Sequence, residues 1–200
     1  MESQYKTNIL EIKGNWEQVK RACLTTVGKE MTKSHPSSRW KRELLMAEHS
    51  PIRKITVCWS WETIPYAIST HFARHHVGCT PWIKTSRADR TKVERSSRPQ
   101  TELISMEMEA NLQSIINISR VRLCKKADPE TTKYWNSFLN ELKNIDEDVY
   151  FVCVPQCIRY AGCPEIKSCK YFLDFKDAFI KDNMIERYET YYSIIDGKTK

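Results

Sequence analysis

Apolar and polar residues alternate most regularly between residues 54 and 61 of the 200-residue chain. Every second position in this segment is large and apolar: Ile55, Val57, Trp59 and Trp61. A period of two along the chain predicts a strand that buries one face. A second, shorter strand is predicted over Thr7–Lys13.

Capping residues and apolar spacing predict several helices. Asn15, followed three residues later by Gln18, begins a helix that runs to about Val27, and Ser37 or Ser38 begins the next one. Side-chain oxygens at these positions accept hydrogen bonds from the first free backbone N–H groups of a helix. Both segments are therefore predicted to be helical from the residue after the cap.

Two further helices begin at a proline. Thr63 and Pro65 open a helix that ends near residues 74–76, and the Asp-Pro pair at 128–129 begins another that ends at about Ile145. A proline in the first turn costs nothing, because its missing N–H would have no partner there.

The centre of the chain is predicted to hold its longest helix, Glu102–Lys126. The polar segment before it, Val77–Gln100, is interrupted by prolines and is predicted to be a long ordered loop, and such loops in compact domains are usually functional. The last fifty residues carry four cysteines and many tyrosines, and their pattern assigns no clear structure.

Composition indicates a globular protein, because 40% of the residues are hydrophobic and 10% are aromatic. We predict one domain over residues 1–200, with a cysteine-rich C-terminal segment at about 150–200. The predicted fold class is α/β (α+β), with a mostly antiparallel or mixed sheet flanked by helices and a long central helix. No apolar run approaches the ~18 residues of a membrane span, and the N-terminus lacks the layout of a signal peptide. We therefore expect a cytoplasmic protein.

The net charge of +7 favours anionic partners, and phosphorylated cofactors and nucleotides fit this charge as well as nucleic acid does. Arg74, His75 and His76 end a predicted helix beside the polar loop, which contributes Arg87 and Arg90. Guanidinium groups make paired bonds to phosphate oxygens. The residues in this pattern are equally consistent with a solvated basic face.

The predicted central helix is unusually polar. Asn111 and Arg122 are eleven residues apart and would lie within about 20° of one face, with Ser114 on the same stripe. Because asparagine and serine are poor helix formers, this face suggests a surface that meets a ligand. The alternative is a partly exposed helix with incidental amides.

Cysteines occur at positions 153, 157, 163 and 169. Structural zinc sites prefer ligand pairs two to four residues apart, and only the interval from Cys153 to Cys157 meets this spacing. We therefore favour buried or redox-labile thiols over a zinc site formed by Cys153, Cys157, Cys163 and Cys169. Cys79 has no obvious activating base nearby in the sequence, so we do not expect it to be a nucleophile.

Two blocks of residues resemble the flavin-dependent thymidylate synthases. The first runs from Glu48–Pro51 through the alternating strand to Ile64–Tyr66 and Phe72–His76. The family has a His-x-Thr-Pro segment, a strand, and a helix that ends in Arg-His-Arg, with a serine beyond it.

The second block resembles a later helix of the family, which carries an asparagine, a second asparagine six residues on and an arginine eleven residues on. Asn111, Asn117 and Arg122 have this spacing. The two blocks occur in the same order as in the family and together span about residues 40–126.

The loop departs from the family pattern. His76 replaces the second arginine of the tripeptide, and Cys79–Trp82 replaces the family's Ser-x-Asn-Glu. Lys84 occupies the position of the family serine, so Thr85 or Ser86 takes this role only after a shift in the alignment.

The resemblance implies an enzyme that binds FAD between the subunits of a homotetramer. An enzyme of this family transfers a one-carbon unit from methylenetetrahydrofolate to C5 of dUMP, with NADPH as reductant. The resemblance implies that FAD is bound by His49, Ser50, Arg74, His75, His76, Asn111, Gln113 and Asn117. It implies that the nucleotide is bound by His71, Arg74, Thr85, Ser86, Arg87, Arg90 and Arg122. Arg122 would also be catalytic, because it would hold the pyrimidine carbonyls as negative charge develops on the ring.

Two alternatives remain open from the sequence. The altered loop is compatible with hydroxymethylation of dUMP or dCMP, in which water and not hydride resolves the one-carbon intermediate. A protein of another class, a zinc-stabilised nucleic-acid-binding protein, would use the basic loop and the cysteines. We expect small-molecule substrates, with neither a membrane nor a nucleic acid as partner.

Overall fold

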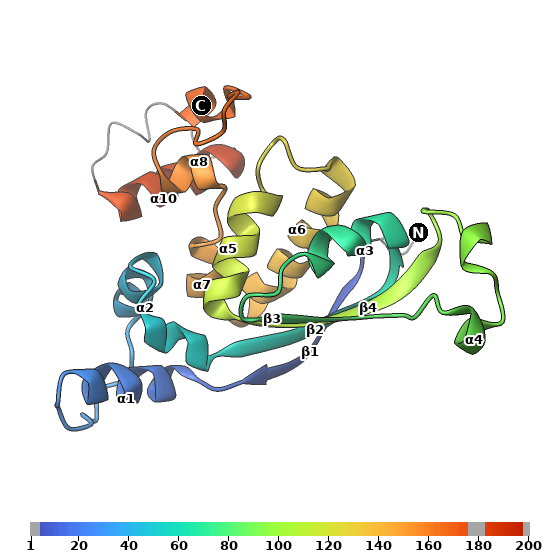
Figure 1. Ribbon diagram of the computed structural model, residues 1–200. Helices are drawn as coiled ribbons and strands as arrows, with labels where there is room; N and C mark the ends of the chain where they lie inside the picture. Colours follow the sequence, from blue (N-terminus) through green and yellow to red (C-terminus); the bar gives the residue numbers. More distant parts are fainter. Residues whose placement is uncertain (1–4, 176–182, 198–200) are drawn as a thin grey trace.

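The computed structural model describes residues 5–175 and 183–197, and its centre is a four-stranded antiparallel sheet. The strands follow the order β1-β2-β4-β3 across the sheet. They are β1 (Thr7–Lys13), β2 (Thr56–Pro65), β3 (Cys79–Ile83) and β4 (Leu103–Asn111). Figure 1 shows helices α3, α5 and α6 on one face of this sheet, with the other face left uncovered.

The register of the strands explains why helices cover one face only. Trp59 and Trp61 of β2 pair with Met108 and Met106 of β4, and all four side chains are buried. The intervening residues point to the opposite face, where Ser60 pairs with Glu107. The predicted strand at residues 54–61 is therefore confirmed, and it continues to Pro65.

The buried face of β2 is covered by aromatic side chains. Trp59 stacks on Phe138 with ring centroids 4.2 Å apart, and Trp61 lies 4.7 Å from Phe72. Phe138 belongs to α6 (Pro129–Ile145) and Phe72 to α3 (Tyr66–Ala73), so the two helices are fixed to the sheet by β2. Burial of rings of this size is a main source of core stability.

Three of the predicted helix starts are confirmed by their caps. Side-chain oxygens of Asn15, Ser37 and Asp128 accept hydrogen bonds from the backbone N–H groups of Gln18, Trp40 and Thr131. Besides α3 and α6, the described residues contain the α-helices α1 (Trp16–Thr26), α2 (Ser38–Met46), α4 (Ala88–Thr91), α5 (Leu112–Arg122), α7 (Glu147–Phe151), α8 (Gln156–Arg159) and α10 (Met184–Ile195). They also contain the short 3₁₀ helices η1 (Ser50–Lys54), η2 (Arg95–Ser97) and η3 (Tyr171–Phe175).

The prediction of a long central helix over residues 102–126 is wrong. Its first half is strand β4, and only Leu112–Arg122 is helical. Met106 and Ala110 are four residues apart, which matches helical spacing, but Ile104 and Met108 are buried as well and reveal a period of two. The longest helix among the described residues is α6, with 17 residues.

The prediction of one long loop over residues 77–100 is also wrong in part. This segment contains edge strand β3, the short helix α4 and η2. Prolines at positions 81 and 99 suggested a loop, but an edge strand tolerates a proline because one side of it has no strand to bond.

Within the described residues, no helix has the length and apolarity to cross a membrane.

Candidate functional site

The candidate site lies where the segment after α3 crosses the start of α5. The backbone N–H of Asn111 donates to the carbonyl oxygen of Gly78 at 3.0 Å, and the hydroxyl of Ser114 donates to the carbonyl oxygen of Val77 at 2.6 Å. The prediction that Asn111 lies on the face of a helix is wrong. Asn111 is the N-cap of α5, and its Oδ1 accepts from the N–H of Ser114. Its functional role there stays a prediction.

A half-open cavity of about 130 Å³ lies beside this crossing. The cavity is lined by Arg74, His75, His76, Val77, Ser114, Asn117 and Ile118. The structure thus brings together the predicted tripeptide and the predicted asparagine at position 117, which are far apart in the sequence. The resemblance had implied that both bind FAD, and the structure gives them one common cavity.

Arg122 joins this group through His75. Its Nε–H donates to His75 Nε2 at 3.0 Å, and its Nη2 donates to the backbone oxygen of His71. The guanidinium carbon also lies 5.9 Å from the ring centre of Phe72. Arg122 is therefore held in one orientation at the end of α5, beside the cavity.

His75 is a neutral hydrogen-bond donor at pH 7. Burial, with smaller effects of the charges on Arg122 and His76, lowers its pKa from 6.5 to about 4. Because Arg122 donates to Nε2, the ring proton must sit on Nδ1. Burial also lowers the pKa of Arg122, but a guanidinium stays charged in proteins.

Besides Asn111, three predicted cofactor residues lie outside the lining of this cavity. His49 and Ser50 are exposed at the start of η1. Gln113 is half-buried and its Nε2 donates to the carboxylate of Glu48 at 2.6 Å. Glu48 also binds Arg120 and Arg159, and the sequence analysis had assigned it no role of its own.

The predicted substrate loop is arranged differently from expectation. Ser86 lines a second cavity of about 140 Å³, together with Tyr66, Lys84, Arg95, Arg98, Pro99, Gln100, Glu102 and Ile104. Thr85, Arg87 and Arg90 are exposed and do not line it, and Arg87 is paired with Asp89 at 2.9 Å. His71, which was predicted to contact the nucleotide, lines neither cavity, and its Nδ1 is 2.7 Å from the hydroxyl of Thr131.

Arg95 and Arg98 line this second cavity and were not predicted from the sequence, and Arg98 is the more buried of the two. Its side chain is only 14% exposed, and its Nη1 donates to Glu102 at 2.7 Å. Its buried Nε has no hydrogen-bond partner. An unpaired N–H on a buried charged group is costly, so an acceptor in the cavity would stabilise this side chain.

The two cavities lie at opposite ends of β4. Ile104 lines the second cavity, whereas Asn111 packs against the segment that lines the first. The separation of seven positions from Ile104 to Asn111 corresponds to roughly 23 Å of extended strand. No nucleoside monophosphate is long enough to reach both cavities of one chain.

The cysteines of the C-terminal segment are not arranged around a metal. Among the described residues, no three histidine, cysteine or acidic side chains are placed to hold a metal ion. Burial raises the pKa of Cys153 to about 12 and of Cys157 to about 11, which favours protonated thiols over thiolate ligands. Burial also raises the pKa of Cys79 to about 11, against a role as nucleophile.

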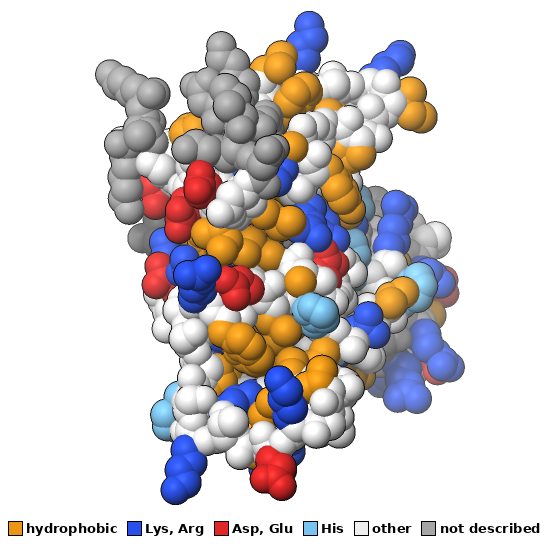
Figure 2. Space-filling view, turned by 90° about the vertical axis from the view of Figure 1, so that its left-hand side faces the viewer, with side chains coloured by type: hydrophobic (Ala, Val, Ile, Leu, Met, Phe, Trp, Pro, Cys, Tyr) orange, Lys and Arg blue, Asp and Glu red, His pale blue; other side chains and the backbone are white. Residues whose placement is uncertain are grey.

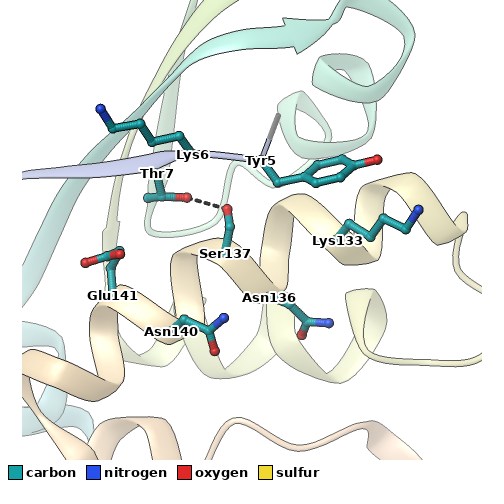
Figure 3. A pocket seen from close by; sticks show the side chains of 8 residues that line it. All are labelled: Tyr5, Lys6, Thr7, Lys133, Asn136, Ser137, Asn140 and Glu141. Atoms are coloured by element: carbon teal, nitrogen blue, oxygen red, sulfur yellow. Dashed lines mark hydrogen bonds between the residues drawn. The ribbon is translucent and has the colours of Figure 1, made fainter. Parts of the chain in front are cut away.

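A larger cavity of about 530 Å³ lies away from all predicted site residues, between the start of β1 and α6 (Figure 3). Polar and charged residues line it, and the hydroxyls of Thr7 and Ser137 bond to each other there at 2.6 Å. The ammonium of Lys133 lies 5.4 Å from the ring centre of Tyr5. None of the residues that the resemblance assigns to the cofactor or the nucleotide lines this cavity.

The basic residues form no continuous stripe on the face shown in Figure 2, where Lys and Arg side chains are scattered among apolar and acidic ones. A surface that tracks a nucleic-acid backbone concentrates its positive charge. This face therefore does not favour the nucleic-acid alternative.

Comparison of the chain with known proteins gives matches at the level of structure. No model of a known family matches the sequence, and no curated protein matches it significantly. Thymidylate Synthase X (ThyX) from Helicobacter pylori, solved with FAD and dUMP, superposes with a TM-score of 0.61 at 12% identity, over 74% of this chain and 98% of that one. The chain has the fold of the flavin-dependent thymidylate synthases.

A second flavin-dependent thymidylate synthase structure from Helicobacter pylori gives a TM-score of 0.62 at 10% identity, over 74% of this chain and 99% of that one. The UMP/dUMP methylase PolB from Streptomyces cacaoi, bound with 5-Br dUMP, gives 0.58 at 10% identity, over 74% and 93% of the two chains. This chain thus contains nearly the whole of the ThyX fold, and about a quarter of this chain lies outside the match.

Gly78 is expected to be essential for the crossing. Its φ is +67°, and an added Cβ would lie 2.4 Å from Asn111 Nδ2 and 2.6 Å from Ser114 Oγ. Gly78→Ala should therefore lower the free energy of unfolding by roughly 2–4 kcal/mol, as backbone strain and overpacking add. Gly28→Ala is the matched control, because Gly28 has φ +65° with no atom within 4 Å of the added Cβ. Urea unfolding that shows equal losses would contradict the steric argument.

His75 should titrate at about pH 4 in the folded protein, and its ring resonances in NMR would show this directly. The unfolded chain binds more protons than the folded one between about 4 and 6.5. The contribution of His75 to the free energy of unfolding is thus complete above pH 6.5 and is lost as the pH falls towards 4. His75→Gln should remove this part of the acid destabilisation, whereas His35→Gln, at a side chain that is 93% exposed, should retain it.

Proposed function

We propose that this protein is a flavin-dependent enzyme that transfers a one-carbon unit from methylenetetrahydrofolate to C5 of a pyrimidine deoxynucleotide. The product would be a methylated nucleotide, dTMP when the substrate is dUMP. One observation carries the proposal: the Arg122–His75 pair and Asn117 adjoin one cavity within a ThyX fold.

The donors at the first cavity suit a flavin. His75 offers a neutral Nδ1–H, Asn117 offers an amide, and Arg74 offers a guanidinium. Flavin rings present carbonyl oxygens and ring nitrogens that accept such bonds, and the bound flavin would supply the transfer of the one-carbon unit and of hydride. The residues present therefore fit the cofactor.

The size of the cavity indicates how much of FAD one chain can hold. Pockets for drug-sized ligands usually measure roughly 300–1,000 Å³, whereas this cavity has about 130 Å³. One chain thus accommodates a part of FAD, and the rest would be covered by another copy. This supports the expectation of a homotetramer with FAD between subunits.

The phosphate of the nucleotide would bind in the second cavity. Lys84, Arg95 and Arg98 provide positive charge there, and Ser86 provides a hydroxyl. Because the two cavities of one chain are roughly 23 Å apart along β4, a nucleotide at the flavin would use the phosphate-binding cavity of a neighbouring copy. Arg95 and Arg98 then take the role that the sequence had assigned to Arg87 and Arg90.

Arg122 would act on the base. Its Nε–H is used by His75, and its remaining N–H groups can donate to a pyrimidine carbonyl. Such bonds strengthen as negative charge develops on the ring when C5 becomes nucleophilic. His75 and the backbone oxygen of His71 hold the guanidinium in place for this, so that no reorganisation is needed during the reaction.

Hydroxymethylation remains the second candidate, on the altered loop. Pro81 and Trp82 occupy β3 in place of the family's polar residues, and Trp82 is 48% exposed. NADPH would be required as reductant for methylation, whereas a hydroxymethyl product requires water at the last step.

Asn117→Asp tests the flavin site. A carboxylate still accepts from Arg120, which lies 3.2 Å from Asn117 Oδ1, but it has no N–H to donate. We expect unchanged stability within about 0.5 kcal/mol and FAD affinity reduced roughly five- to tenfold, since a lost bond of this kind is worth roughly 1–1.5 kcal/mol. Flavin fluorescence titration measures the affinity, and equal affinity of both proteins would refute the assignment.

Arg122→Lys tests the chemistry. Lysine keeps the charge but loses the planar fork, so the variant should fold and retain FAD while turnover falls roughly a hundredfold or more. Mass spectrometry of dUMP and dCMP, incubated with reduced flavin and methylenetetrahydrofolate, identifies the product. A gain of about 14 mass units indicates methyl and about 30 indicates hydroxymethyl. If the wild-type protein modifies neither nucleotide, the proposed function is wrong.

A further inference from the structure

Glu48 occupies a backbone position that does not suit a glutamate. It follows α2 with φ +54°, and its N–H bonds to the carbonyl oxygen of Leu45 at 3.1 Å. Left-handed residues directly after a helix are usually glycine, because any Cβ is strained there. The side chain must therefore contribute something that offsets this strain.

The carboxylate of Glu48 collects three donors from two helices. Gln113 and Arg120 reach it from α5, and Arg159 reaches it from α8 at 3.1 Å. The side chains of Arg120, Arg159 and Glu48 are 14%, 18% and 22% exposed. Burial raises the pKa of Glu48, but the bonds and charges of its partners outweigh this and keep the pKa below 4.5. Glu48 is thus ionised at neutral pH.

An ionised carboxylate only accepts hydrogen bonds, so it dictates how its neighbours are turned. Gln113 must present Nε2 to Glu48, and the same Nε2 lies 3.5 Å from the side-chain amide of Asn117. Arg120, bound to Glu48 through Nη2, is held with Nη1 3.2 Å from that amide. A guanidinium only donates, so the atom of Asn117 that faces it must be Oδ1. The N–H groups of Asn117 are then the part of its amide left for a ligand in the first cavity.

We propose that Glu48 is a positioning residue that fixes the orientation of the Asn117 amide through Arg120 and Gln113. Its effect on FAD rests on the proposed function, whereas its effect on Asn117 does not. Arg159 brings the C-terminal segment onto the same carboxylate, so α8 supports the site without lining its cavity.

Glu48→Gln is the informative variant, because it preserves shape but introduces N–H donors and removes the charge. Gln113 and Arg120 are then no longer forced into one arrangement, and Asn117 is free to turn. Glu43→Gln is the matched control: Glu43 is also paired with an arginine, Arg39, at 2.9 Å, but lies on the exposed side of α2.

The first measurement is FAD affinity in a double-mutant cycle. Glu48→Gln should weaken binding about tenfold in the wild-type background, the loss expected for one misoriented donor. In the Asn117→Ala background it should have no further effect, because the group that it orients is absent. Equal losses in both backgrounds would indicate a general structural role and overturn the proposal.

The second measurement needs no flavin. In ¹⁵N NMR spectra of the ligand-free protein, Glu48→Gln should shift or broaden the side-chain amide resonances of Asn117, and Glu43→Gln should leave them unchanged. Unaltered Asn117 resonances in Glu48→Gln would overturn the proposal. A wild-type protein that binds no FAD would refute the proposed function, and the NMR comparison would still decide the role of Glu48.

Discussion

The one-sided burial of β2 determines the rest of the architecture. Trp59 and Trp61 present their indole rings to the same face of the sheet, and only helices on that face can remove them from water. With α3, α5 and α6 all on one side (Figure 1), the end of α3 and the start of α5 are brought together at one end of the sheet. The candidate site is therefore a product of core packing, and its position follows from that of the tryptophans.

Sequence reasoning succeeded where one period was unambiguous and failed where two periods overlapped. In residues 54–61 the large apolar side chains recur at every second position, whereas Met106 and Ala110 in β4 satisfy a helical spacing as well as a period of two. The tripeptide at 74–76 and Asn117 could be predicted to share a site from their resemblance to a known family. Glu48 and Arg98 could not be predicted, because their importance comes from partners that only the fold brings near.

The candidate site offers hydrogen-bond donors to a ligand, and the charges of the side chains around it decide which donors are available. His75 is kept neutral by burial and by the neighbouring guanidinium, so it donates through Nδ1 and does not compete with Arg122 as a cation. Arg120 and Arg159 share the one carboxylate of Glu48, which leaves positive charge beside Asn117. An anionic or electron-rich ligand is favoured there over a cation.

The edges of the sheet limit how copies of this chain can associate. Edge strand β1 carries an irregularity between Ile9 and Glu11, and edge strand β3 has Pro81 at its middle, which removes a backbone donor. Both features prevent a foreign strand from extending the ladder, and so protect against amyloid-like growth. Contacts between copies of this chain would then involve the faces and loops of the molecule and would leave the register of the sheet unchanged.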